Sequence, residues 1–158
     1  MAKTIRLPLL RFGVLSAMLV CALCSTAQSR GAAVSKGQLE EAIMSVQTGG
    51  SLAARTNAAK RLALLTRRID PKEVDDPTLE KLVSLLNTNE DSVRAYVAGA
   101  LGILGPRAKV AVPALLKLLP EVDCLGGALT SATFVRHALE RMGETPPPEP
   151  ICRGTVSR

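Results

Sequence analysis

Apolar residues recur three and four positions apart over most of the chain, starting with Leu39, Ala42, Ile43 and Val46. This spacing is typical of amphipathic helices, and no stretch alternates apolar and polar residues long enough to suggest a sheet. Ser35 and Gln38 form a capping-box pattern before the first helix. Turn-forming residues separate the apolar runs, at Gly49-Gly50, Asn87-Thr88-Asn89, Gly105-Pro106 and Gly126-Gly127. The pattern predicts an all-α fold of six helices in three antiparallel hairpins.

A repeat of about 39 residues underlies this pattern. The segment 62–65 matches 101–104, and Ala100-Leu101 matches Ala138-Leu139 after a further 38 positions. The longer helix of each hairpin is predicted at 52–68, 91–105 and 129–143, after shorter helices at 39–46, 79–86 and 112–119. One such hairpin cannot bury its own apolar face, so neighbouring hairpins must stack.

Residues 91–105, DSVRAYVAGALGILG, followed by 111–119, AVPALLKLL, resemble the HEAT repeat. The similarity is closest to the short bacterial form also found in phycobilisome lyases, and it covers about residues 36–143. It implies an α-solenoid that binds other proteins. The segment 69–76 departs from the family pattern, because it is a longer, acidic connector without Gly-Pro.

The resemblance implies structural roles for Asp91, Arg94 and Pro113. In the family, such an Asp starts the helix and such an Arg makes hydrogen bonds between adjacent repeats, although Ala132 replaces the Arg in the third copy. Residue type alone also favours Asp91 as an N-cap, over the alternative of a catalytic acid. Pro113 falls in the first turns of its helix, where proline is tolerated.

Three glycines, at positions 99, 102 and 105, suggest a phosphate-binding loop at first sight. Such a loop needs a preceding strand, which the pattern does not predict. Because a glycine inside a helix costs about 1 kcal/mol, we interpret them as sites of close helix packing.

The N-terminal segment has the composition of an export signal. Lys3, Arg6 and Arg11 flank the apolar run 12–24, which is followed by small residues. This run is short for a membrane span of about 20 residues, although an uncleaved anchor is the alternative. We therefore expect a signal peptide at 1–27, a flexible segment at 28–35, a solenoid at 36–143 and a Pro-rich tail at 144–158. The expected location is periplasmic or secreted.

Removing the expected signal peptide changes the net charge and the number of cysteines in the chain. The net charge of +6 falls to +3 when residues 1–27 are removed, because three basic residues and no acids leave with them. The case for nucleic-acid binding weakens accordingly. Cys124 and Cys152 remain, and an oxidising compartment would allow them to form a disulfide, with two free thiols as the alternative. The bond would hold the tail as a strap.

No catalytic motif occurs, and we expect neither an enzyme nor a cofactor nor a metal site. The single histidine, His137, has only Glu140 at helical spacing. A lyase-like role is suggested by the resemblance alone.

The candidate binding surface consists of helix positions that face away from the predicted stack. In the middle repeat these are positions 95, 96, 99 and 103, and both aromatic residues beyond the signal fall in such sets. Aromatic residues beside Arg and Lys are typical of interface hot spots. The alternative is that Tyr96 and Phe134 pack on each other. The candidate protein-binding residues are Lys60, Tyr96, Ile103, Phe134, His137 and Arg141.

These observations predict an exported, non-catalytic adaptor or scaffold that binds a protein in the cell envelope. A membrane-anchored scaffold is an alternative if the N-terminal segment is not cleaved, and this segment would then be the only membrane contact. Apolar end helices at 39–46 and 135–142 could also drive self-association. Basic residues in 54–68 beside acidic residues in 70–91 indicate either solvated faces or a landing surface for an acidic partner or anionic lipid.

Overall fold

The computed structural model describes residues 34–123 and 130–149, in which helices are the only regular secondary structure. All of them belong to one of the two units into which the chain divides, Ala33–Arg158. The signal segment, Gly126-Gly127 and both Cys124 and Cys152 lie outside the described residues. The fold of the described part is all-α, as the apolar spacing predicts.

The first hairpin consists of α1 (Lys36–Thr48) and α2 (Leu52–Thr66). The capping box that precedes α1 is confirmed: the Ser35 hydroxyl accepts from the backbone N–H of Gln38, and the Gln38 side chain accepts from the backbone N–H of Ser35. The Ser51 hydroxyl caps α2 by accepting from the N–H of Ala54 at 3.2 Å. Polar residues at the predicted boundaries therefore start both helices.

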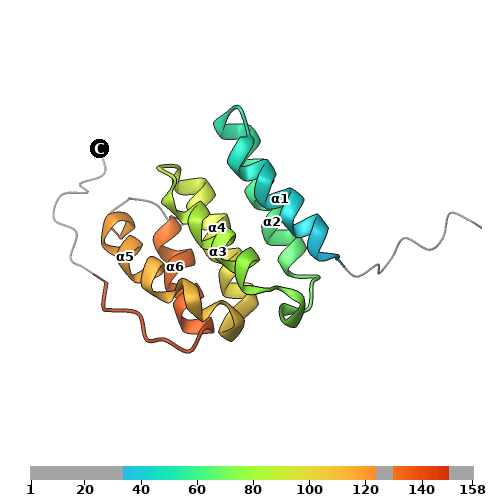
Figure 1. Cartoon of the computed structure of the whole chain (residues 1–158). Helices are drawn as coiled ribbons and strands as arrows, with labels where there is room; N and C mark the ends of the chain where they lie inside the picture. Colours follow the sequence, from blue (N-terminus) through green and yellow to red (C-terminus); the bar gives the residue numbers. More distant parts are fainter. Residues whose placement is uncertain (1–33, 124–129, 150–158) are drawn as a thin grey trace, which may run out of the picture. The chain divides into compact units, whose positions relative to one another are not determined.

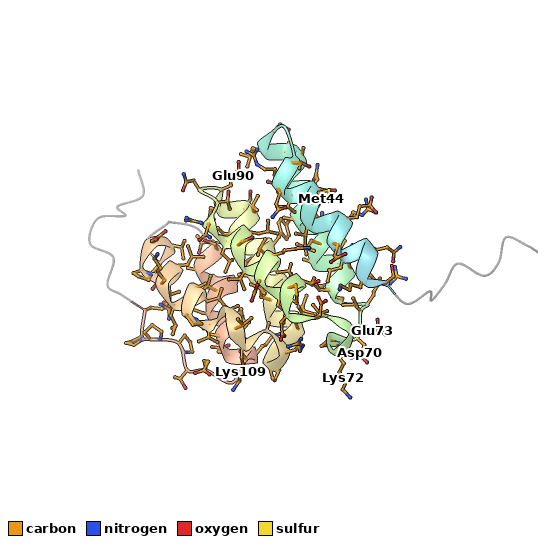
Figure 2. All side chains as sticks on the ribbon, viewed as in Figure 1. Met44, Asp70, Lys72, Glu73, Glu90 and Lys109 are labelled. Carbon is orange, nitrogen blue, oxygen red and sulfur yellow. The ribbon has the colours of Figure 1, made fainter. Side chains whose placement is uncertain are left out.

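The second hairpin consists of α3 (Asp76–Ser84), the short 3₁₀ helix η3 (Leu85–Asn87) and α4 (Asp91–Leu104). Asp75 is the N-cap of α3. The preceding acidic connector contains a further 3₁₀ helix, η2 (Pro71–Glu73), which the apolar spacing does not predict. Its residues Asp70, Lys72 and Glu73 lie at the periphery of the helices in Figure 2. Gly105 ends α4 with a φ of 56°, a left-handed conformation that favours glycine.

The third hairpin consists of α5 (Val112–Val122) and α6 (Ser131–Arg141), and the 3₁₀ helix η4 (Gly105–Ala111) leads into it. Pro113 lies in the first turn of α5, as predicted. After α6 the described part of the tail, 144–149, is without helix, and the Pro147 carbonyl accepts from Arg136 at 2.5 Å. Arg136 also pairs with Asp123 at 2.7 Å, and both side chains are almost fully buried.

The helices are arranged so that α4 lies between α2 and α6 and contacts both (Figure 1). The shorter helix α3 contacts α1 and α4, and α5 contacts α6 and η3. The core between them is aliphatic, as expected for a chain with 2% aromatic residues. Its largest fully buried side chains include Leu39, Leu62, Leu79, Leu101, Leu115 and Leu139.

The expected basis for self-association is wrong. The apolar residues of 39–46 that form the helical stripe, and those of 135–142, are buried inside the hairpins. Neither end helix exposes that stripe, because α1 packs on α2, α3 and η3, and α6 packs on α4 and α5. The exposed large apolar side chains of the described residues are instead scattered, at Met44, Leu52, Leu64, Val110 and Leu116.

One stretch of the described residues, Asp91–Val122, is long and apolar enough to cross a membrane. It is not a single straight helix, because the left-handed Gly105 and the non-helical Ala108 divide it into α4, η4 and α5. Leu101 and Leu115, on either side of this break, are both fully buried in the shared core. Its apolar content is therefore used in packing the hairpins.

Candidate functional site

A hollow of about 550 Å³ opens on the surface formed by α2, α4 and α6. Its lining combines apolar, aromatic and basic side chains from all three helices. All six candidate protein-binding residues line it, and their role in binding stays a prediction. The complete lining is Lys60, Ala63, Leu64, Arg67, Tyr96, Gly99, Gly102, Ile103, Phe134, His137, Ala138 and Arg141. We refer to this surface as the groove.

The groove follows the sequence repeat. One row across the three helices consists of Lys60, Gly99 and His137, and a second consists of Leu64, Ile103 and Arg141. Equivalent positions of successive repeats thus lie side by side. In the first row, α4 has Gly99 where α2 has Lys60 and α6 has His137. The missing side chain leaves space over α4 in the groove.

The two groove glycines differ in what surrounds them. A Cβ atom at Gly102 would lie 2.9 Å from the Cα atom of Ala138, closer than real Cβ contacts. A Cβ atom at Gly99 would lie 3.4 Å from the Phe134 ring, an ordinary contact. Gly102 therefore permits the close approach of α4 and α6, as the packing interpretation predicts, and Gly99 mainly leaves room in the groove.

The two aromatic rings lie between the core and the groove, and both the binding role and the packing of the rings on each other stay predictions. Tyr96 and Phe134 are half-buried and pack against the aliphatic core, and both also line the groove. One outward assignment is wrong, because Ala95 is buried with 6% exposure. The reason is that α4 packs against both α2 and α6. More of its surface is therefore buried than the single apolar stripe of the sequence predicts.

The charged lining is exclusively basic. Lys60, Arg67 and Arg141 line the groove, and none of the lining residues is Asp or Glu. His137 contacts Glu140 at 3.2 Å between Nδ1 and Oε2. Arg67 was not among the predicted outward positions, although it belongs to the basic run in 54–68. The small lining residues Ala63, Gly102 and Ala138 were not predicted either.

The expectation that Asp91 caps its own helix is wrong. Glu90 is the N-cap residue of α4, and Asp91 is the first helical residue. The Asp91 carboxylate instead accepts hydrogen bonds from the backbone N–H and the hydroxyl of Ser131, at the start of α6. The reason is that α6 begins beside the start of α4, and its unsatisfied amides compete for the same carboxylate.

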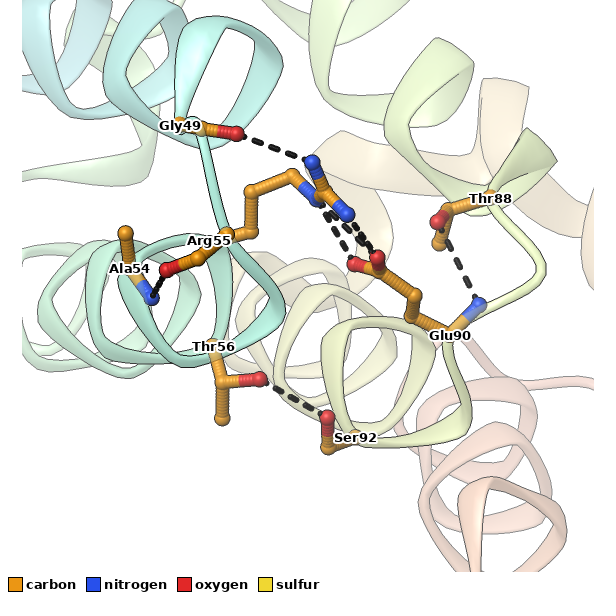
Figure 3. Close-up of polar contacts among 8 residues, drawn as sticks. Gly49, Ala54, Arg55, Thr56, Thr88, Glu90 and Ser92 are labelled. Carbon is orange, nitrogen blue, oxygen red and sulfur yellow. Dashed lines mark hydrogen bonds and ion pairs between the residues drawn. The ribbon is translucent and has the colours of Figure 1, made fainter.

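Arg94 does reach the next hairpin, as the resemblance implies. Its guanidinium lies 3.4 Å from Glu121 on α5, and its side chain is 13% exposed. The equivalent residue of the first hairpin, Arg55, makes a fuller interaction with the second hairpin. It donates to both carboxylate oxygens of Glu90 and to the Gly49 carbonyl (Figure 3).

This Arg55–Glu90 pair changes the acidity of both groups. Hydrogen bonding to Arg55 holds the pKa of Glu90 below its ordinary value, and the pKa of Arg55 is raised by the same bond. Beside it, the Thr56 and Ser92 hydroxyls are 2.9 Å apart, also drawn in Figure 3. These contacts join α2 to the start of α4 and lie outside the groove lining.

Within residues 34–123 and 130–149, no group of three or more His, Cys, Asp or Glu side chains is placed to hold a metal ion. The predicted disulfide between Cys124 and Cys152 lies outside the described residues.

Comparisons with family models, with curated proteins and with solved structures gave no match for this chain.

Proposed function

We propose that this chain is an exported, HEAT-like α-solenoid that binds another protein through the groove and does no chemistry itself. The observation that carries the proposal is the composition of the groove. Two half-buried aromatic rings, two aliphatic side chains and three basic side chains converge on one concave surface. Aromatic and Arg anchors in a concavity are typical of protein-binding hot spots.

The solenoid part of the proposal is supported by the order of contacts. The second helix of each hairpin contacts the second helix of the next, and equivalent positions 39 and 38 residues apart lie side by side in the groove. Hydrogen bonds link successive hairpins near the starts of α2, α4 and α6, through Arg55 with Glu90 and through Asp91 with Ser131. Stacked repeats typically present such a continuous surface to partners.

The proposal is tested by affinity capture with the chain from residue 28 onward, from extracts of the cell envelope of its source. A groove variant, Leu64→Asp, is compared with the matched variant Met44→Asp. Leu64 and Met44 are both exposed, at 51% and 61%, but only Leu64 lines the groove. Met44 lies on α1 in Figure 2.

A protein retained by wild type and Met44→Asp and lost from Leu64→Asp is the expected result, with equal helicity of all three chains by circular dichroism. No captured protein, or equal recovery by both variants, would contradict binding through the groove. Export is tested separately by the intact mass of the chain from its source, which is expected to match cleavage after residue 27. A full-length mass would favour a membrane anchor.

A further inference from the structure

Basic side chains in the groove lack partners, whereas most other basic side chains of the described residues have them. Within residues 34–123 and 130–149, Lys60, Arg67 and Arg141 take part in no ion pair. Seven others outside the groove each lie within ion-pair distance of an acid: Lys36, Arg55, Lys81, Arg94, Arg107, Lys109 and Arg136. Most basic side chains outside the groove are therefore paired with an acid, whereas the three that line it are not.

The uncompensated charges lie on both outer helices of the groove. Lys60 is on α2, Arg67 is the C-cap residue of α2, and Arg141 is on α6. Between them the lining is apolar, with Tyr96 and Ile103 from α4 and Phe134 from α6. A complementary ligand thus needs apolar atoms in its centre and negative charge on both sides.

We infer that the partner presents to the groove an acidic peptide segment in which an aliphatic or aromatic side chain is flanked by Asp or Glu. This inference rests on the proposed function and deepens it by naming the chemistry of the bound segment. The apolar side chain contacts Tyr96, Ile103 and Phe134, and the flanking carboxylates pair with Lys60, Arg67 and Arg141. Such charge complementarity orients the segment and speeds its association.

A peptide suits this surface better than an anionic membrane does. The basic residues surround a hollow of about 550 Å³ whose floor includes Gly99 and Gly102. A bilayer surface is flat on this scale and cannot follow a concave lining, whereas a single peptide segment can enter it. Of the exposed large apolar side chains of the described residues, only Leu64 lines the groove.

The test uses a displayed library of random 12-residue peptides selected on the chain from residue 28 onward. Binding of the selected peptides is then measured by fluorescence anisotropy with three variants. The groove variant is Lys60→Gln/Arg67→Gln/Arg141→Gln. Its matched control, Arg61→Gln/Lys72→Gln/Lys117→Gln, removes the same charge from exposed residues outside the groove. Leu64→Asp tests the location of binding independently of the basic residues.

Selected peptides are expected to be rich in Asp and Glu around a Leu, Phe or Tyr. The groove variant should weaken their binding about 10-fold or more, because three exposed ion pairs are lost, and the control should change it less than about twofold. Higher salt should weaken binding to wild type and leave the groove variant nearly unaffected.

The other outcomes separate the inference from the proposed function. Neutral or basic peptides that Leu64→Asp no longer binds would overturn the acidic partner and keep peptide binding in the groove. Peptides that Leu64→Asp still binds, or no selected peptide, would contradict the proposed function itself. Vesicles of phosphatidylglycerol are a parallel probe: groove-dependent binding to them without selection of acidic peptides would assign the surface to anionic lipid and overturn the inference.

Discussion

The two junctions on either side of α4 are built by different interactions. Toward the first hairpin, aliphatic packing is accompanied by three ion pairs: Arg55 with Glu90, Lys36 with Asp75 at 2.5 Å, and Lys81 with Glu40 at 3.6 Å. An ion pair also reaches the third hairpin, from Arg94 to Glu121 at 3.4 Å. Toward the third hairpin the helices come close together, and Gly102 lies against Ala138. Both junctions use an acid at the start of α4: Glu90 reaches α2 and Asp91 reaches α6.

This difference shows that neighbouring copies of one repeat need not be held by the same forces. Ion pairs at partly exposed side chains depend on pH and salt, whereas close packing does not. Because three ion pairs accompany the packing at the first junction, it should loosen more than the second under acidic or high-salt conditions. The variants below change one junction at a time.

Gly102→Ala should have the largest effect. The added methyl group would overlap Ala138 unless α6 shifts, and overpacking of this kind costs about 1–3 kcal/mol, against a gain of up to about 1 kcal/mol in helix propensity. We expect a net loss of about 1–2 kcal/mol in the free energy of unfolding, measured by urea denaturation. An unchanged midpoint would mean that the close approach of α4 and α6 is not required.

Asp91→Ala should weaken the same junction by about 1 kcal/mol or somewhat more, because the amide and hydroxyl of Ser131 lose their acceptor. A double-mutant cycle with Ser131→Ala isolates this contact from the effect of the charge on its own helix. The two substitutions should be clearly non-additive. Additive losses would show that the contact does not contribute to stability.

Gly99→Ala is the matched control for Gly102→Ala. The new methyl group would make only an ordinary contact with Phe134, so the gain in helix propensity should dominate. We expect the free energy of unfolding to rise by up to about 1 kcal/mol in the same urea experiment. A loss as large as that of Gly102→Ala would show that the whole groove floor, and not one point of it, is tightly packed.

Glu90→Gln should affect only the first junction, and less than the changes above, because its pair with Arg55 is partly exposed. We expect faster amide hydrogen exchange in α1 and α2, with α6 unchanged. The wild type in high salt should show the same pattern. Exchange that increases equally in α6 would contradict the independence of the two junctions.

The smallest effect should be the pH dependence that arises from Asp75. Hydrogen bonding to Lys36, and then to Thr78, lowers the pKa of Asp75 from 3.8 to about 2. The unfolded chain therefore takes up this proton first as the pH falls, so the stabilisation is complete above pH 3.8 and is lost as the pH falls through about 2. Asp75→Asn keeps an N-cap for α3 and should flatten the stability profile in this range. If Asp75→Asn left the pH dependence of the free energy of unfolding unchanged below pH 3.8, Asp75 would not be its source.

The sequence contained most of the information about the local structure. Capping residues and glycines at 35, 38, 49 and 105 lie where the described helices begin and end, because these signals act within a few residues of the chain. The 39-residue spacing likewise brought equivalent outward positions together, and the six candidate residues line one groove. The acidic connector gave no apolar signal for η2, because its short turn is not amphipathic.

Apart from the Arg94 contact and the close packing at Gly102, the contacts between hairpins were decided by the tertiary structure. Ala95 is buried because α4 has neighbours on both sides, and Asp91 bonds to Ser131, 40 residues away, because α6 begins beside it. That Lys60, Arg67 and Arg141 have no ion-pair partner among the described residues also depends on which acids the fold brings near them. Periodicity specifies which face of a helix is apolar, whereas only the packing of several helices determines what that face, and the charges around it, will meet.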